Sequence, residues 1–254
     1  MLKVKEFKGH SGCMVELYDD NSTYKVIKSG SPKLAASADL LDCLRIKGFK
    51  TPKVKVISED KIEMEYINGV DMKTYIERAD NKDIDKLISF INSYFDSFKA
   101  FEEIDIKQPI VDKLSSIEEH VDFDRINFSF TQLLDRLPQE VTVDVCHGDF
   151  TLDNILYYKN DFYLIDANPT DISCVEYDGS KLRQDLDCLW FVRNKKNKTN
   201  YRIVCNKISN ELKKQWTFLK NDSILIFMLL RILPYCTEES TRDFLYKEIN
   251  KLWP

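Results

Sequence analysis

Residues 144–170 read DVCHGDFTLDNILYYKNDFYLIDANPT, and this segment contains the polar residues most suggestive of chemistry. Its pattern predicts strand, polar loop, strand, turn and strand. Asn154 follows Asp149 by five residues, and Asp166 follows Asn154 by twelve. A carboxylate beside such apolar runs must be paired, metal-bound or solvent-facing, because burying it alone is costly. We therefore expect the rest of the chain to be organised around this segment.

The composition is that of an ordinary globular protein. The 254 residues are 43% hydrophobic, with only seven glycines and seven prolines, so the chain can bury a large core in one large domain or two small ones. The formal charge of −5 argues against nucleic acid as a partner, because no strong basic field attracts phosphate backbones. A small anionic ligand needs only local charge and is compatible with this balance.

The seven cysteines are scattered and include no CxxC pair, which is typical of reduced thiols in a cytoplasmic protein. The N-terminal sequence MLKVKEFKGH has no apolar core of a secretory signal. The longest apolar run, residues 224–230, ends at Arg231 and is shorter than the ~20 residues that a membrane span needs. We therefore expect a cytoplasmic protein with no membrane span, in which this run is a buried helix.

The periodicity of the chain changes near Gly69. Before it, short β-prone runs alternate with turn formers, and one helix is expected from Ser31, as its N-cap, to a stop at Gly48. After it, helical spacing dominates residues 72–101. Later helices are expected at 178–194, 199–217, 222–235 and 239–251. The sequence thus predicts an α+β fold, with a small antiparallel sheet and one helix in residues 1–67 and a larger, mainly helical lobe in residues 68–254.

Asp149, Asn154 and Asp166 are side chains of the kind that phosphoryl transfer requires. A carboxylate positions the attacking hydroxyl and accepts its proton, while further oxygens hold Mg²⁺ against the nucleotide phosphates. The spacing brings these groups to one face of a compact loop. Two other interpretations stay open: a hydrolase metal site formed by His147, Asp149 and Asp166, and a purely structural loop.

The motif HGD at 147–149, followed after four residues by Asn154 and then by Asp166 at the end of an apolar strand, resembles the aminoglycoside phosphotransferase and choline kinase family. The fold of that family is similar to that of protein kinases. The resemblance implies a bilobed, protein-kinase-like fold. It also implies that Asp149 is the catalytic base, that Asn154 and Asp166 bind Mg²⁺, and that His147 braces the catalytic loop.

Weaker signals near the N-terminus agree with a nucleotide site. Gly9, Ser11 and Gly12 lie between two predicted strands, where glycines let backbone N–H groups approach phosphates, although a plain hairpin turn fits the same residues. The resemblance implies a phosphate-holding lysine on the next strand. Lys28 matches that position best, and Lys25, on the opposite face of the strand, is the alternative.

The family pairs this lysine with a glutamate on the following helix, and the present sequence has no glutamate there. Asp39 is our preferred substitute and Asp42 is the alternative, each one methylene shorter than glutamate. The resemblance also implies an inter-lobe connector whose backbone groups hydrogen-bond the adenine edge of ATP or GTP. We expect Glu65, Tyr66 and Ile67 to form this connector.

The acceptor is expected to bind in the helical lobe, where acids could attract a cationic acceptor and aromatic rings could cage a quaternary ammonium. Such residues are more often a solvated face or core. The acids are Asp122, Asp124, Glu176 and Asp185, and the aromatics are Trp190, Phe191, Trp216 and Tyr235. Asp178 is the expected N-cap of a helix, and the resemblance implies that it supports the catalytic loop.

The sequence therefore predicts a Mg²⁺-dependent kinase that transfers the γ-phosphoryl of ATP or GTP to a hydroxyl of a small acceptor, such as an amino sugar, sugar, choline or ethanolamine. A non-catalytic nucleotide-binding module that regulates a partner is the alternative, because the helix glutamate is missing. A protein kinase proper is less favoured, since HGD replaces HRD and little chain separates Asp166 from Asp178 to hold a peptide. The sequence does not indicate the oligomeric state.

Overall fold

The structure is a computed structural model, and it describes residues 1–8, 12–21, 23–99, 102–170 and 172–253. The chain divides into two compact units, which are described separately. The first comprises Met1–Arg78 and Val145–Ser173, and the second comprises Ala79–Asp144 and Cys174–Pro254. The predicted α+β class is confirmed, with an antiparallel sheet in the N-terminal part and helices in the C-terminal part. The lobe boundary after residue 67 stays a prediction.

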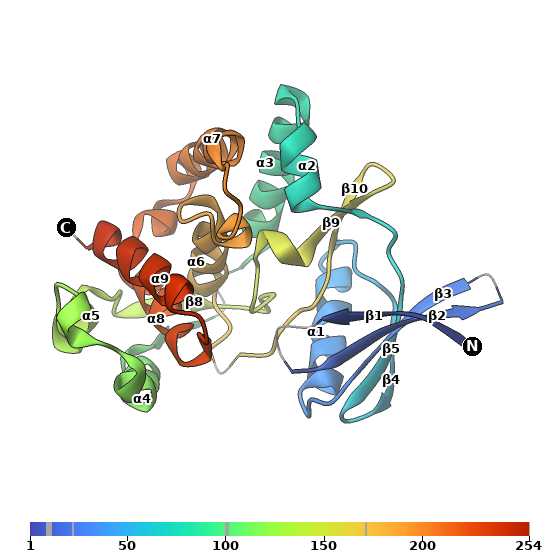
Figure 1. The fold of residues 1–254 in the computed structure, drawn as a ribbon, viewed down its shortest axis with the longest axis horizontal. Coiled ribbons are helices and arrows are strands. Elements are labelled where there is room, and N and C mark those ends of the chain that lie inside the picture. The colour runs from blue at the N-terminus through green and yellow to red at the C-terminus, as the bar shows by residue number, and fades with distance from the viewer. Residues whose placement is uncertain (9–11, 22, 100–101, 171, 254) are drawn as a thin grey trace. The chain divides into compact units, whose positions relative to one another are not determined.

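The first unit is built on an antiparallel sheet with the strand order β1-β2-β3-β5-β4 (Figure 1). The strands are β1 (Leu2–Lys8), β2 (Met14–Asp20), β3 (Thr23–Ser29), β4 (Val54–Ser58) and β5 (Lys61–Glu65). Lys28 pairs with Ile62 across the sheet, so the two side chains share a face. Ile62 packs there with Leu34 and Ala38 of α1 (Leu34–Ile46). This apolar face holds α1 against the sheet.

The start of α1 differs from the prediction and its end agrees with it. Lys33, rather than Ser31, is the N-cap, and the Ser31 hydroxyl accepts a hydrogen bond from the backbone N–H of Lys33 at 3.3 Å. Pro32 and Lys33 form a turn ahead of the helix. Gly48 has a φ of 100° and so turns the chain away from the helix, as expected for a glycine stop.

A smaller sheet in the same unit has the order β10-β9-β6. The predicted hairpin is confirmed as β9 (Ile155–Tyr158) and β10 (Asp161–Leu164). Lys159 and Asn160 both have positive φ, which is the geometry of a two-residue hairpin turn. β6 (Val70–Asp71), which the sequence pattern did not reveal, pairs with β9 and leads into α2 (Met72–Arg78).

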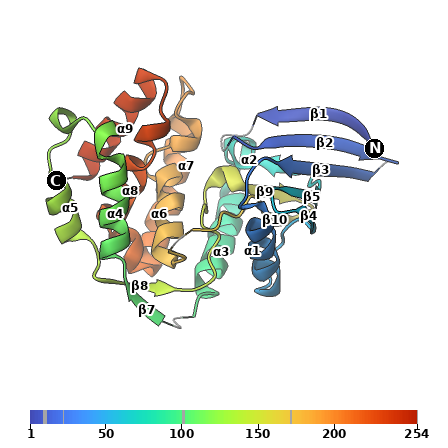
Figure 2. The same cartoon turned by 90° about the horizontal axis from the view of Figure 1, so that it is seen from below.

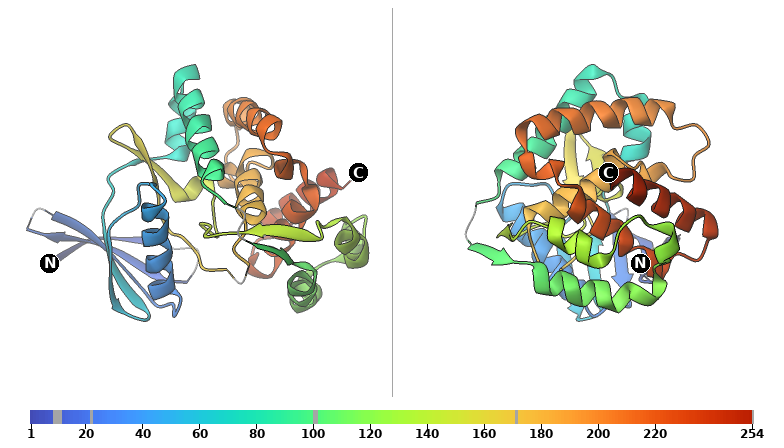
Figure 3. Two further views of the ribbon diagram at one scale, coloured as in Figure 1. Left: turned by 180° about the vertical axis from the view of Figure 1, so that it is seen from behind. Right: turned by 90° about the vertical axis from the view of Figure 1, so that its left-hand side faces the viewer.

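The second unit is mainly helical. Its helices are α3 (Asn81–Asp96), α4 (Lys107–Ile117), α5 (Phe130–Arg136), α6 (Val175–Leu186), α7 (Thr199–Gln215), α8 (Asp222–Leu230) and α9 (Glu239–Leu252). α6 contacts both α7 and α8 (Figure 2). Residues 223–230 of α8 are all buried, which confirms the predicted core helix. The strand β7 (Glu102–Asp105) follows α3 in the chain and β8 (Glu140–Val143) follows α5. The two strands pair as an antiparallel ribbon (Figure 3).

Three helix predictions were wrong in their bounds. The helix expected at 222–235 ends at Leu230, as α8, and a separate 3₁₀ turn follows at Leu233–Tyr235. The stretch at 72–101 is split between α2 and α3, because the Asp80 side chain caps α3 by accepting from the N–H groups of Lys82 and Asp83. The helix expected at 178–194 is α6, which begins at Val175 and ends at Leu186. Beyond it Leu189 has a φ of 58°, which is incompatible with a continuing right-handed helix.

Across the described part of the chain, no helix combines the length and the apolar character needed to cross a membrane. The seven cysteines are free thiols. Burial raises the pKa of Cys174, Cys188 and Cys205, so these thiols are poor nucleophiles and act as small core residues.

Candidate active site

The loop that carries Asp149 is held by His147, whose side chain is fully buried. The ring atom Nε2 lies 2.9 Å from the carbonyl oxygen of Ile165, and the backbone N–H of Asp149 donates to Nδ1 at 3.3 Å. A neutral imidazole with its proton on Nε2 satisfies both contacts. The ring therefore joins the loop containing Asp149 to the residue that precedes Asp166.

Gly148 allows these two segments to approach closely. Its φ is 77°, and a Cβ at this position would lie 1.9 Å from the carbonyl oxygen of Asn168. The neighbouring backbone is hydrogen-bonded, since the Asn168 N–H donates to the His147 carbonyl at 2.9 Å. Only glycine combines this backbone angle with this approach.

Asn154 is bonded to the predicted base. Its side-chain nitrogen donates to the backbone oxygen of Asp149 at 2.9 Å and to the carboxylate atom Oδ2 of Asp149 at 3.0 Å. The 3₁₀ turn η3 (Leu152–Asn154) sets this spacing, because the Asn154 N–H also donates to the Thr151 carbonyl at 3.1 Å. With its nitrogen engaged by Asp149, the Asn154 side chain has the oxygen Oδ1 as the atom that can ligate a cation.

Asp166 follows β10 in a left-handed backbone conformation, with a φ of 59°. Aspartate tolerates this region better than most residues, but it still requires support from its surroundings. The support comes from the preceding residue, because the Ile165 N–H donates to the Asn154 carbonyl at 3.0 Å. The backbones that carry Asn154 and Asp166 are thus joined directly.

Lys28 reaches Asp166 across 138 residues of sequence, and the two side chains form an ion pair between Nζ and Oδ1. The Lys28 side chain is buried, with 10% of its surface exposed, whereas the Asp166 side chain is 52% exposed. Lys25, the alternative lysine, lies on the other face of β3 and pairs with Asp20 and Glu63. Of the two candidate lysines, Lys28 is therefore the one that contacts Asp166.

The other predicted nucleotide residues are only partly described. Gly9 and Ser11 lie outside the described residues, while Gly12 precedes β2 with a φ of 76°. In the predicted connector, the Glu65 N–H donates to the Lys53 carbonyl at 2.9 Å and the Tyr66 N–H to the Tyr24 carbonyl at 3.4 Å. The Ile67 side chain, the third predicted member, is buried.

Neither of the two acids on α1, Asp39 and Asp42, contacts Lys28. Asp39 is exposed and has no ion pair with any residue that the structure describes. Asp42, the alternative, pairs with Arg45 at 2.7 Å on the same helix. The acidic partner of Lys28 is Asp166 instead.

The sequence suggested that Asp178 is the N-cap of its helix, and the structure shows that it is not. Cys174 occupies that position, and Asp178 lies within the first turn of α6, fully buried. Its carboxylate accepts a hydrogen bond from the Tyr94 hydroxyl of α3. This contact gives a buried polar group a hydrogen-bond partner within the helical unit.

Two lysines that the sequence analysis did not select contact segments of the site. Lys73 of α2 pairs with Asp153, next to Asn154, at 2.9 Å. Lys47, at the end of α1, donates to the Val145 carbonyl at 3.1 Å. No local sequence signal identifies either lysine, because each contact depends on the packing of distant segments.

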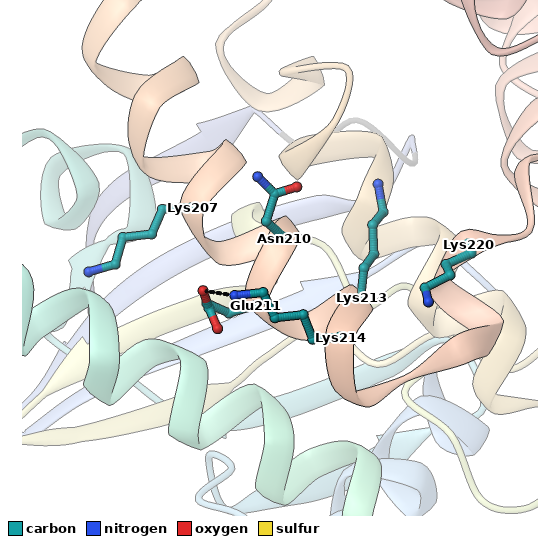
Figure 4. A pocket seen from close by; sticks show the side chains of 6 residues that line it. All are labelled: Lys207, Asn210, Glu211, Lys213, Lys214 and Lys220. Carbon is teal, nitrogen blue, oxygen red and sulfur yellow. Dashed lines mark hydrogen bonds and ion pairs between the residues drawn. The ribbon is translucent and has the colours of Figure 1, made fainter.

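A hollow of about 560 Å³ lies in the second unit on α7 and the turn η5 (Thr217–Lys220) (Figure 4). Its lining residues are Lys207, Asn210, Glu211, Lys213, Lys214 and Lys220. Three of these lysines already pair with acids of the chain, namely Asp85, Asp187 and Glu211. The hollow contains none of the predicted site residues and is not the candidate active site.

No protein-family model matches the chain, and no curated protein sequence matches it. Solved structures do match. Aminoglycoside phosphotransferase APH(4)-Ia superposes with a TM-score of 0.66 and 11% identity, over 100% of this chain and 93% of that one. Ethanolamine kinase of Plasmodium vivax superposes with a TM-score of 0.60 and 14% identity, over 98% of this chain and 81% of that one.

Amicoumacin kinase hAmiN, in complex with AMP-PNP, Ca²⁺ and Ami, gives a TM-score of 0.55 and 14% identity, over 98% of this chain and 88% of that one. The similarities extend along nearly the whole chain and include both the sheet and the helices. The resemblance inferred from the HGD motif is thus confirmed at the level of the fold. The chain has the kinase-like fold shared by these small-molecule phosphotransferases.

Proposed function

We propose that the chain is a cytoplasmic, Mg²⁺-dependent small-molecule kinase that transfers the γ-phosphoryl of ATP or GTP to an acceptor hydroxyl. The observation that carries the proposal is the ion pair between Lys28 and Asp166. It joins the strand of the predicted phosphate lysine to the segment of Asp166, whose neighbour Ile165 is hydrogen-bonded to the Asn154 carbonyl. Structural neighbours that are themselves small-molecule kinases support it further.

In the proposed reaction, a carboxylate oxygen of Asp149 accepts the hydroxyl proton of the acceptor as the acceptor oxygen bonds to the γ-phosphorus. The bond from that phosphorus to the β-phosphate oxygen breaks, and the nucleoside diphosphate leaves. Asn154 orients the base, because its side-chain nitrogen donates to Asp149 Oδ2. Catalysis then consists mainly of positioning and charge neutralisation.

The side chains present fit a magnesium ion. Asn154 Oδ1 and a carboxylate oxygen of Asp166 are hard oxygen donors, and Mg²⁺ bound to nucleotide phosphates commonly takes only one or two ligands from protein carboxylates. The hydrogen bond between the Ile165 N–H and the Asn154 carbonyl keeps the two residues adjacent. Bound Mg²⁺ would neutralise charge on the nucleotide phosphates. Lys28 would then exchange part of its contact with Asp166 for the α- and β-phosphates.

A non-catalytic nucleotide-binding module is the second candidate. It is favoured by the absence of an ion pair between Lys28 and an acid of α1, within the described residues. Such a module would bind nucleotide without transferring phosphate. The two candidates differ in turnover and not in nucleotide affinity.

Lys28→Met should lower kcat/KM for the nucleotide by about 10²-fold, because the variant keeps the apolar stem and removes the positive charge at the phosphates. Lys25→Met is the matched control on the same strand. The ion pairs of Lys25 are partly exposed and lie on the face of β3 away from Asp166, so activity close to that of the wild type is expected. Steady-state kinetics of nucleotide consumption measure both. A larger loss of kcat/KM in Lys25→Met than in Lys28→Met would show that Lys28 is not the lysine that contacts the phosphates.

The proposal is tested by measuring nucleotide consumption against amino sugars, monosaccharides, choline, ethanolamine and hydroxy-amino acids, with ATP and GTP in parallel. We expect Mg²⁺-dependent turnover with at least one class. Calorimetry of nucleotide binding completes the experiment. Tight binding without turnover on every acceptor would favour the regulatory module.

A further inference from the structure

The helix α1 contacts the segment that carries the predicted base, although it supplies no acid to Lys28. The contact is made by its C-terminal end, where Lys47 Nζ donates to the Val145 carbonyl at 3.1 Å. Val145 lies two residues before His147. The segment that follows α1, residues 47–50, also contacts the strand leading to Asp166, since the Leu164 N–H donates to the Lys50 carbonyl at 2.8 Å.

The segment of residues 47–50 is fixed to the end of α1, so its position follows that of the helix. Gly48 reverses the chain with a φ of 100°, and its N–H donates to the Arg45 carbonyl at 3.0 Å. The Phe49 N–H donates to the Leu44 carbonyl at 3.1 Å, and the Phe49 side chain is buried. These bonds fix residues 48 and 49 to the last turn of the helix, so Lys47 extends from a rigid base.

The Val145 carbonyl is linked in turn to the catalytic loop. The next residue, Cys146, donates its N–H to the Ser173 hydroxyl at 3.0 Å, and His147 then contacts the Ile165 carbonyl. A hydrogen bond from an ammonium group is stronger than a neutral one. Lys47 therefore holds one end of a short segment whose other end is the predicted base, Asp149.

We propose that Lys47 is a positioning residue of the phosphoryl-transfer site, which couples α1 to the loop of Asp149 through the Val145 carbonyl. The coupling takes the place of a link between a mid-helix acid and Lys28, and the inference rests on the proposed kinase function. A simpler role for Lys47 is to complement the negative end of the helix dipole, as lysines near helix C-termini often do. That role predicts an effect on stability without an effect on kcat.

The test compares Lys47→Met, Lys47→Arg and a control, Lys33→Met, in the full chain. Lys33 is exposed at the opposite end of α1. Lys47→Met should lower kcat by about 10- to 100-fold, because a small shift of a catalytic group has an effect of this size, while the nucleotide KM stays within about twofold. Lys47→Arg should recover most of kcat, and Lys33→Met should match the wild type.

Amide hydrogen exchange supplies a readout that does not depend on activity. Exchange over residues 146–149 should be faster in Lys47→Met than in the wild type, and unchanged in Lys33→Met. Unchanged exchange, or a wild-type kcat in Lys47→Met, overturns the inference. If the wild type phosphorylates no acceptor, the kinase proposal fails, and the exchange result alone then decides whether Lys47 holds the loop.

Discussion

Asp149→Asn is expected to abolish phosphoryl transfer while leaving nucleotide binding nearly unchanged. Asparagine has almost the same shape as aspartate, so the contact with the side-chain nitrogen of Asn154, now 3.0 Å from Asp149 Oδ2, can persist through the amide oxygen. The amide cannot accept a proton from the acceptor hydroxyl. Loss of a general base lowers kcat by about 10²- to 10⁴-fold.

The measurement pairs steady-state kinetics with calorimetric titration of Mg²⁺-nucleotide. Asp161→Asn is the matched control, because Asp161 is an exposed acid at the turn of the adjoining hairpin. It should retain wild-type kcat. Turnover at the wild-type rate in Asp149→Asn would show that the base is another group. Loss of nucleotide binding together with turnover would instead indicate that the substitution disturbs the whole loop.

Gly148→Ala is expected to damage both stability and activity. An alanine at a φ of 77° costs roughly 1–2 kcal/mol from the left-handed backbone alone. The added Cβ would also lie 1.9 Å from the Asn168 carbonyl, so the loops of Asp149 and Asp166 must separate. A displacement of about 1 Å at reacting groups lowers kcat by about 10²-fold.

Gly30→Ala separates the two causes. Gly30 also has positive φ, at 100°, but a Cβ there meets no described atom within 4 Å. The control should therefore show the backbone cost in urea unfolding while keeping kcat. Equal losses of stability in the two variants, with normal turnover in Gly148→Ala, would contradict the close approach of the two loops.

Much of the candidate site follows from local sequence pattern. The hairpin of β9 and β10 was predicted from two short apolar runs around Lys159 and Asn160, and the structure has it. Strand alternation placed Lys28 and Lys25 on opposite faces, and only Lys28 contacts Asp166. The hairpin and the two faces of β3 depend on residues close together in sequence, whereas the contact between Lys28 and Asp166 spans 138 residues.

Other features could not be predicted because distant packing determines them. Aspartate is a residue type that favours the N-cap, yet Cys174 is the N-cap of α6. The Asp178 carboxylate instead accepts a hydrogen bond from the Tyr94 hydroxyl, 84 residues away. The bond between Lys47 and Val145 spans 98 residues. The short strand β6 contains two residues and carries no periodicity to detect.

The missing helix acid shows how a family pattern can mislead. The resemblance required a carboxylate on α1 for Lys28, and Asp39 was the preferred substitute. Asp39 is one methylene shorter than glutamate, and it is exposed on the helix surface. Lys28 instead pairs with Asp166, so the charge of this buried lysine is balanced by the loop that follows β10.

The most direct test of the central claim follows the γ-phosphoryl group itself. The wild type and Asp149→Asn are incubated with Mg²⁺, an accepted hydroxyl compound and ATP or GTP whose γ-phosphoryl is isotopically labelled, and the compound is then analysed by mass spectrometry. The wild type should place the labelled phosphoryl on a hydroxyl oxygen of the compound, and Asp149→Asn should leave the compound unmodified. Equal labelling by the two proteins, or labelled inorganic phosphate as the sole product of the wild type, would contradict the account.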